Sequence, residues 1–429
     1  MGESFEETLF EAAFDTDGPG EGRGLSPDAA RAEPRNALRA AASLSMTKLS
    51  DGLIDPKLVL SWLLTALGVP AVFIGLLVPI REAGALLPQL AVAGRVQAVA
   101  RRKWLWAAGS AGQGVAAAGI AAAALTLSGW AAGLAVCACL AALAICRSLC
   151  SVSFKDVLGK TVAKSRRGTV TGLAGTIASA GTVAFALLLM AGPADRFALV
   201  TGAVALAGVF WLLAGALFAT LHEAASEPEA SPGNPLRHLS LLREDPQLAR
   251  FVAVRGCLTA TALAPPFLVL LARGDAAAPF EQLGALVLAS AVAAFASSYV
   301  WGRLSDRSSR KVLIFAGLLG AAALAAAVAL RSADLFAGAL PVAACLFGLM
   351  LAYHGVRSGR STHLVDMAPE TARAGYAAVS NTVIGILLLA SGAFGALAAM
   401  VGPALPVALF AALCILAAVL ALGLEEVER

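Results

Sequence analysis

Charged residues are scarce in this chain. Only 14% of its 429 residues are Asp, Glu, Lys or Arg, whereas about a quarter are charged in an average soluble domain. Aromatic residues are also few, at 6%, although the girdles of a membrane-spanning β-barrel need many of them. With 59% hydrophobic residues, the composition excludes a soluble domain and a barrel. It indicates an all-α polytopic membrane protein.

Motifs for phosphate binding, metal binding and nucleophilic catalysis are absent from the sequence. The cysteines lie in apolar stretches, lack the spacing of a metal site and are interpreted as small apolar side chains: Cys137, Cys139, Cys146, Cys150, Cys257, Cys345 and Cys414. We therefore expect neither an ATP-driven pump nor a membrane enzyme. No cofactor and no nucleic-acid partner is expected either.

Apolar stretches of the length that crosses a bilayer recur along the chain. They predict twelve transmembrane helices, at 58–80, 82–100, 104–127, 130–153, 169–191, 197–220, 251–271, 283–301, 312–330, 335–356, 375–400 and 404–422. A polar, Pro-rich linker at 222–250 separates the first six from the last six. We expect six-helix bundles at 57–221 and 251–424, followed by a short tail at 425–429.

Lys and Arg are concentrated in the loops that follow every second expected helix. By the positive-inside rule, both termini and the linker then lie in the cytoplasm. Abundant Arg and Ala favour a bacterial inner membrane. Residues 1–56 have acidic residues and no signal-peptide pattern, so they are expected to form a disordered cytoplasmic tail whose residues 1–45 are dispensable for folding.

Three short patterns recur in the two halves at nearly one spacing. Gly94-Arg95-Val96 with Arg102-Lys103 recurs 208 residues later as Gly302-Arg303-Leu304 with Arg310-Lys311. Arg147-Ser148 with Asp156 recurs 210 residues later as Arg357-Ser358 with Asp366, and Arg166-x-Gly168 recurs 207 residues later as Arg373-x-Gly375. Agreement at equivalent places indicates a duplicated six-helix unit, a common plan among transporters.

The stretch from Gly302 to Lys311 reads GRLSDRSSRK. It resembles the loop signature of the major facilitator superfamily, G-x-L-[AS]-D-[RK]-x-G-R-[RK], with a match at seven of ten positions. The resemblance implies two pseudo-symmetric six-helix bundles around a central cavity, and secondary active transport of a small molecule by alternating access. A non-transporting membrane sensor, a lipid flippase partner or an assembly factor on the same fold remains the alternative.

The same resemblance implies a cytoplasmic gate, in which a loop carboxylate binds a facing helix N-terminus and Arg side chains form forked bonds to carboxylates. The candidate gating residues are Gly94, Arg102, Gly302, Asp306, Arg307, Arg310, Arg147, Arg357 and Asp366. Ordinary positive-inside charge is the alternative for Arg303 and Arg307. The first-half copy has Ala98 where the second has Asp306, so the two loops are not equivalent.

Carboxylates inside the expected helices are nearly absent, although ion-driven carriers often place Asp or Glu there. Glu82, beside Arg81, is the exception: the repeat spacing places the pair within the membrane, whereas the hydropathy windows place it in an external turn. The candidates for a substrate or ion cavity are Arg81, Glu82, Gln89, Gln113, Arg255, Tyr299, His354 and Asn381. Interhelical hydrogen bonds are the alternative role.

The expected partners are a small-molecule substrate, a coupling proton or other ion, and the lipid bilayer, with the chain acting as a monomer. Pro265-Pro266 falls within the helix expected at 251–271. Because proline removes a backbone donor, we expect that helix to bend or break at mid-membrane.

Overall fold

The computed structural model describes residues 10, 27–97, 99–163, 166–191, 195–225, 240–272, 283–305, 307–336, 338–369 and 373–427. In chain order its helices are α2 (Pro27–Leu53), α3 (Val59–Ala66), α4 (Ala71–Gln97), α5 (Lys103–Thr126), α6 (Gly129–Thr161), α7 (Arg167–Met190), α8 (Arg196–Ala219), α9 (Leu241–Glu244), α10 (Pro246–Leu258), α11 (Ala260–Leu271), α12 (Leu283–Ser305), α13 (Ser309–Ser332), α14 (Ala339–Met367), α15 (Arg373–Ala390), α16 (Ala393–Val401) and α17 (Ala404–Ala421).

Three spans are each made of two consecutive helices: α2 with α3, α10 with α11, and α15 with α16. With these joined, and the four-residue α9 set aside, the described helices form twelve long segments. Ten segments are both long and apolar enough to cross a membrane; the other two are α2–α3 and α12, whose apolar part is shorter. The expectation of an all-α polytopic membrane protein is confirmed.

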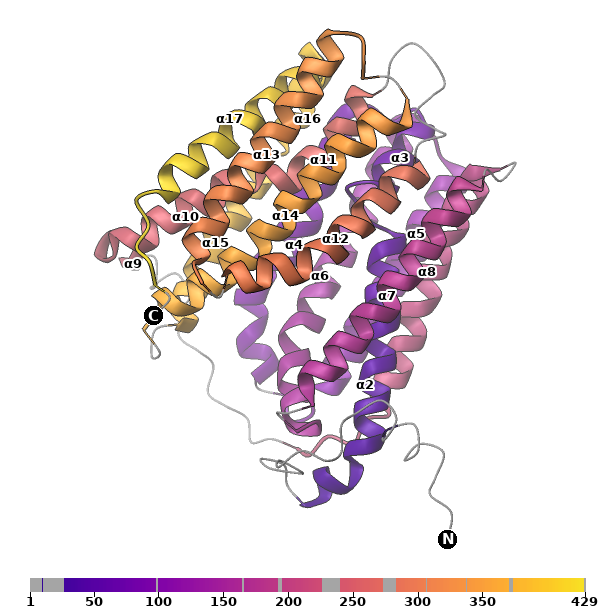
Figure 1. Cartoon of the computed structure of the whole chain (residues 1–429). Helices are drawn as coiled ribbons and strands as arrows, with labels where there is room; N and C mark the ends of the chain where they lie inside the picture. The colour runs from indigo at the N-terminus through magenta and orange to yellow at the C-terminus, as the bar shows by residue number, and fades with distance from the viewer. Residues whose placement is uncertain are drawn as a thin grey trace.

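The segments form two bundles (Figure 1). Helices α2 to α8, drawn from indigo to magenta, pack mainly on one another, and so do α10 to α17, which end in yellow. Contact between the bundles runs mainly through α4, which touches α15 and α16, and through α7, which touches α12. A bundle of six spans on each side of one interface is the arrangement that the repeat predicted.

The first two spans differ from the prediction. Residues 71–97 form one helix, α4, although hydropathy predicted separate helices at 58–80 and 82–100. The first span is α2–α3, which begins within the segment expected to be a tail. Helix α2 is too polar for a hydropathy window to select, because several of its polar side chains face other helices and a cavity rather than lipid.

Helix α2 packs against α7 and α8 along a stripe of small residues. Ala37, Ala40 and Ala41 are 0%, 1% and 3% exposed, which indicates close packing against neighbouring helices. Glu33 adds polar contacts, since its carboxylate accepts hydrogen bonds from the Ala163 N–H at 2.9 Å and from Arg166 Nη1 at 3.0 Å. The expected disordered tail is therefore wrong for residues 27–53; residues 1–9 and 11–26 lie outside the described residues.

A chain that begins at Met46 is expected to be much less stable than the full chain. It lacks the part of α2 that buries Ala37, Ala40 and Ala41 and that carries the Glu33 carboxylate. Thermal unfolding of the purified proteins in detergent measures the effect, with a chain that begins at Ser26, and so keeps α2, as the control. Equal melting temperatures for the full chain and the Met46 form would show that the packing of α2 against α7 and α8 does not stabilise the fold.

The seventh span breaks at a different place from the one predicted. Pro265 and Pro266 lie inside α11, and the break falls at Thr259, between α10 and α11. A proline ring clashes with the carbonyl four residues before it, so the distortion falls on the turn that precedes the prolines. The prediction that this span is broken is confirmed, but the break at Thr259 lies six residues before Pro265.

Candidate functional site

A cavity of about 420 Å³ lies between the two bundles. Its walls come from α2–α3, α6 and α7 on one side and from α12 and α14 on the other. A second hollow of about 440 Å³ shares Ala294, His354 and Arg357 with it, and continues past Trp301 and Ser361. Since pockets of about 300–1,000 Å³ hold small molecules, the central cavity has the size of a substrate site.

The second hollow leads to one particular end of the molecule. We call this the basic end, defined by the last residues of α4 and α12, Gln97 and Ser305, where the two copies of the loop pattern lie. At the other end the bundles touch: a Cβ added to Gly75 of α4 would lie 2.4 Å from the Gly395 Cα of α16. The cavity is thus continuous toward the basic end, and the helices meet at the opposite end.

Asp51 of α2 joins three helices of the first bundle. Its Oδ1 accepts a 2.7 Å hydrogen bond from Arg81 Nη2 on α4, and its Oδ2 accepts a 2.7 Å hydrogen bond from Arg147 Nη2 on α6. The side chains of Asp51, Arg81 and Arg147 are only 25%, 13% and 26% exposed, so their attraction is less screened than at a surface. One carboxylate between two guanidinium groups leaves the cluster with one net positive charge.

The junction between α2 and α3 supplies two more charged groups. Asp55 Oδ1 accepts hydrogen bonds from the backbone N–H groups of Lys57 at 2.6 Å and Leu58 at 3.2 Å, in the turn between the end of α2 at Leu53 and the start of α3 at Val59. Lys57 is 6% exposed, and its Nζ lies 3.5 Å from the ring centroid of Tyr353 on α14. This cation–π contact crosses from one bundle to the other.

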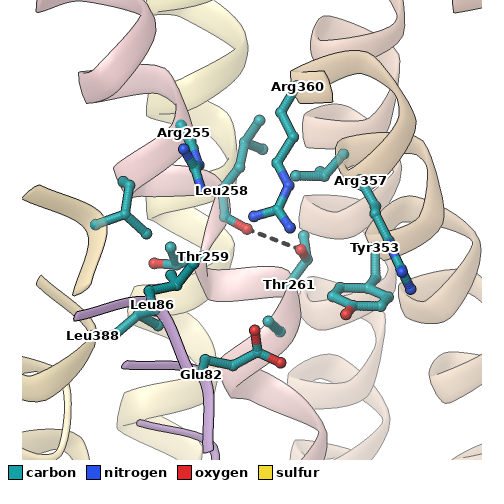
Figure 2. Close-up of a pocket in the computed structure, with 13 residues that line it drawn as sticks. Glu82, Leu86, Arg255, Leu258, Thr259, Thr261, Tyr353, Arg357, Arg360 and Leu388 are labelled. Atoms are coloured by element: carbon teal, nitrogen blue, oxygen red, sulfur yellow. Dashed lines mark hydrogen bonds between the residues drawn. The ribbon is translucent and has the colours of Figure 1, made fainter. Parts of the chain in front are cut away.

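A smaller cavity of about 30 Å³ adjoins these residues, and Figure 2 shows its lining. Glu82 of α4 and Arg360 of α14 point into the same space, with Tyr353 beside them. Arg255 of α10, which also lines this cavity, donates hydrogen bonds to Ser380 Oγ at 2.6 Å and to Asn381 Oδ1 at 2.9 Å. These bonds tie α10 to α15 within the second bundle.

The structure resolves the two interpretations of Arg81 and Glu82. Both lie near the middle of α4, as the repeat spacing predicted, and the external turn is wrong. Of the other cavity candidates, Arg255, His354 and Asn381 lie at or beside the cavities.

The three remaining candidates are Gln113, Gln89 and Tyr299. Gln113 is fully buried within the first bundle, where its Nε2 contacts Gly109 O at 3.3 Å and Cys150 Sγ at 3.4 Å. It packs α5 against α6, so its expected place in the cavity is wrong. Gln89 and Tyr299 lie in α4 and α12, and their side chains are outside the described residues.

Two candidate gating residues are bound within their own bundles. Arg102, which is 7% exposed, forms an ion pair with Asp156, and its backbone N–H donates to Glu223 Oε1 at 3.1 Å. Arg310 forms an ion pair with Glu426 at 3.0 Å in the second bundle. Each bundle thus ties the start of its third span to the segment after its sixth, which explains why this pattern occurs twice. In this conformation the described partners of both residues hold a bundle together rather than join two bundles.

The other gating candidates divide into three groups. Arg147 and Arg357 line the central cavity instead of a loop. Gly94 and Gly302 lie in the last turns of α4 and α12, and Arg307 and Asp366 are exposed at the basic end. Asp306 lies outside the described residues, so its expected gate contact remains a prediction.

Replacing Glu223 with Ala should lower the free energy of unfolding by about 2–3 kcal/mol. Its side chain is 0% exposed and accepts hydrogen bonds from the N–H groups of Arg102 and Lys103 at the start of α5, at 3.1 and 2.8 Å. Thermal unfolding measures the loss. Glu425→Ala, at an exposed carboxylate in the matching part of the second bundle, is the control. An equal effect of the two substitutions would contradict a stabilising role for the hydrogen bonds between Glu223 and the start of α5.

Sequence reasoning missed Lys48, Asp51, Asp55 and Lys57, because they were assigned to the tail or its boundary. The repeat contained a signal that could have found them. Shifting the expected helix 251–271 back by the repeat spacings of 210 and 207 residues falls on 41–64, which overlaps α2 and α3. The internal symmetry therefore predicts a first span that hydropathy alone does not detect.

The sequence matches no protein-family model and no curated protein. Solved structures do match along almost the whole chain. A D-xylose-proton symporter aligns with a TM-score of 0.69 and 13% identity, over 92% of this chain and 98% of that one. A POT family transporter in complex with 5-aminolevulinic acid aligns at 0.68 and 10%, over 90% and 95%. The nucleoside transporter NupG aligns at 0.66 and 12%, over 90% and 98%.

Proposed function

We propose that this chain, which has the two-bundle fold of the major facilitator superfamily, is a secondary transporter that moves a small polar solute by alternating access. The observation that carries the proposal is the central cavity of about 420 Å³ between the bundles, lined by charged side chains from both. Charged groups are costly within a membrane and occur there mainly where they face a cavity or a pathway. The solved structures of similar fold are named as transporters.

The asymmetry of the two ends supports alternating access. At the opposite end, a Cβ on Gly75 or on Gly284 would lie within 3.0 Å of atoms of the other bundle, so the helices are in close contact. Near the basic end, a Cβ on Gly168 or Gly172 of α7 would meet no atom within 4 Å. A transporter with one end sealed and the other open is in one of the two states that alternating access requires.

The orientation follows from charge. We place the basic end in the cytoplasm because it carries the Lys- and Arg-rich loops, which makes this conformation open to the cytoplasm. Both termini and the 222–250 linker are then cytoplasmic, in a bacterial inner membrane, and the chain works as a monomer. Asp51, Asp55 and Glu82 are candidate groups for a coupling proton, since carboxylates in transporter interiors often carry protons.

Cysteine accessibility in a Cys-less background tests the mechanism. Ser179→Cys lines the cavity and should react with a maleimide that enters from the basic end. Ala186→Cys, at a position that is 0% exposed in α7 and next to α12, should stay unreactive until the opposite end opens. In a variant that favours the opposite state, the two reactivities should exchange. Unchanged reactivity of both positions in every background would argue for a static protein and against transport.

A further inference from the structure

The central region of the molecule carries more positive than negative charge. The cations that line the central and the smaller cavity are Lys48, Lys57, Arg147, Arg255, Arg357 and Arg360. Among the described residues, the carboxylates that line them are Asp51, Asp55 and Glu82. Such an excess inside a membrane protein needs a compensating partner, because uncompensated charge is costly away from bulk water.

The contacts within the cavity do not remove this excess. Asp51 is shared between Arg147 and Arg81, so the pair of guanidinium groups keeps one net positive charge. Asp55 and Lys57 lie two residues apart at the α2–α3 junction, and their opposite charges offset each other in the count. Lys48 donates to a neutral acceptor, the Thr171 carbonyl oxygen, at 2.9 Å.

Positive groups also face one another across the cavity from different bundles. Lys48 and Arg147 belong to α2 and α6, whereas Arg357 belongs to α14, and all three line the same space. Arg357 lines the second hollow as well, on the path toward the basic end. Closing that end would bring these like charges together, and their repulsion opposes closure while the cavity holds no anion.

We propose that the cavity binds a small organic anion with at least two negative charges, carried by carboxylate or phosphate groups, and that this anion bridges the two bundles. Lys48 and Arg147 hold it from the first bundle and Arg357 holds it from the second. The guanidinium groups form forked hydrogen bonds to either kind of oxyanion. The proposal rests on the proposed transport function and specifies its substrate class.

The rest of the lining fits this class better than a neutral sugar or a hydrophobic cation. The described residues around the central cavity include one Tyr and no Trp, Asn or Gln, so stacking surfaces and amide groups for sugar hydroxyls are few. Ser179, Thr182 and Ser290 supply hydroxyl groups for the uncharged part of a small solute. A cationic ligand would meet a cavity of its own sign.

The bridge also links binding to the conformational change. An anion between Lys48 and Arg357 replaces repulsion across the cavity with attraction to both walls. The anion therefore favours the state in which the basic end is closed. A cavity open to the basic end is the state expected for the chain without substrate.

Thermal unfolding of the purified full chain in detergent tests the ligand class. Sodium succinate and sodium phosphate are compared with succinamide, the uncharged analogue of succinate, and with sodium chloride at equal ionic strength. Succinate or phosphate should raise the melting temperature, because a ligand that binds only the folded state stabilises it, whereas succinamide and chloride should not. The relative effects of succinate and phosphate show which oxyanion the site prefers.

Matched variants place the binding in the cavity. Arg357→Gln and Lys48→Gln should each weaken the apparent affinity for the anion at least tenfold, and two variants are used in case one fails to fold. Arg331→Gln, at an exposed position in the last turn of α13 near the opposite end, should leave the affinity unchanged. The anion should also speed maleimide labelling of Ala186→Cys severalfold by favouring closure of the basic end and opening of the opposite end, since Ala186 does not line the cavity that holds the anion.

The outcomes separate the two proposals. Equal stabilisation by succinamide or no stabilisation beyond chloride would overturn the anion class. Unchanged affinity in both cavity variants would overturn the placement of the anion in this cavity. Alternating cysteine reactivity would then still support transport of some other solute. Anion binding with no change in the Ala186→Cys labelling would overturn the bridge. Anion binding in a protein whose two ends never exchange reactivity would instead overturn transport and leave an anion-binding membrane protein.

Discussion

The Asp51→Asn variant is expected to lose about 3 kcal/mol of folding free energy. Asn keeps the shape of the side chain but removes the charge that Arg81 and Arg147 share at 2.7 Å each. Both guanidinium groups come from the interior of membrane-spanning helices and would be left without their counter-ion. Removing one member of a buried ionic network costs more than the network contributes, because the remaining charges stay desolvated.

Thermal or denaturant unfolding of the purified protein measures this loss. Asp366→Asn, at an exposed carboxylate on the basic end of α14, is the control and should be nearly neutral. A double variant, Asp51→Asn with Arg147→Gln, should recover part of the stability because it removes one of the two uncompensated cations. An Asp51→Asn protein as stable as the wild type would show that water in the cavity already satisfies both arginines.

The Gly75→Val variant should shift the conformational equilibrium away from the state described here. A Cβ at Gly75 would lie 2.4 Å from the Gly395 Cα and 2.8 Å from its N, and both are backbone atoms that cannot rotate away. Overpacking of this kind costs about 1–3 kcal/mol in the state that contains the contact. The opposite state does not pay this cost if α4 and α16 separate there, so the equilibrium moves about five- to hundredfold.

Labelling rates report the shift. In the Gly75→Val background, Ala186→Cys should react faster and Ser179→Cys slower than in the Cys-less parent. Gly202→Val is the matched control, since Gly202 of α8 is helical and exposed and a Cβ there would meet nothing within 4 Å. A uniformly unstable Gly75→Val protein with unchanged relative labelling would mean that the contact seals a fixed interface rather than a gate.

The sequence by itself determined the class of the fold. Bilayer-length apolar stretches are local properties of the chain, and ten of the twelve spans have them. The three repeated patterns placed the division between the bundles, and they also located Arg81 and Glu82 inside a span when hydropathy did not. These features can be read from the sequence because contact with lipid sets the hydropathy of each segment, and a duplication leaves matching residues in each half.

The cavity was decided by tertiary structure. A hydropathy window averages over neighbours in the chain, so it cannot distinguish a polar residue in a loop from one that faces a cavity. For this reason it assigned Lys48 and Asp51 to a tail. The bond between Asp51 and Arg147 joins residues 96 positions apart, and only helix packing brings them together. Arg102 and Arg310 were predicted to form contacts between the bundles, but each forms an ion pair within its own bundle. The sequence does not show which carboxylate helix packing brings close to each arginine.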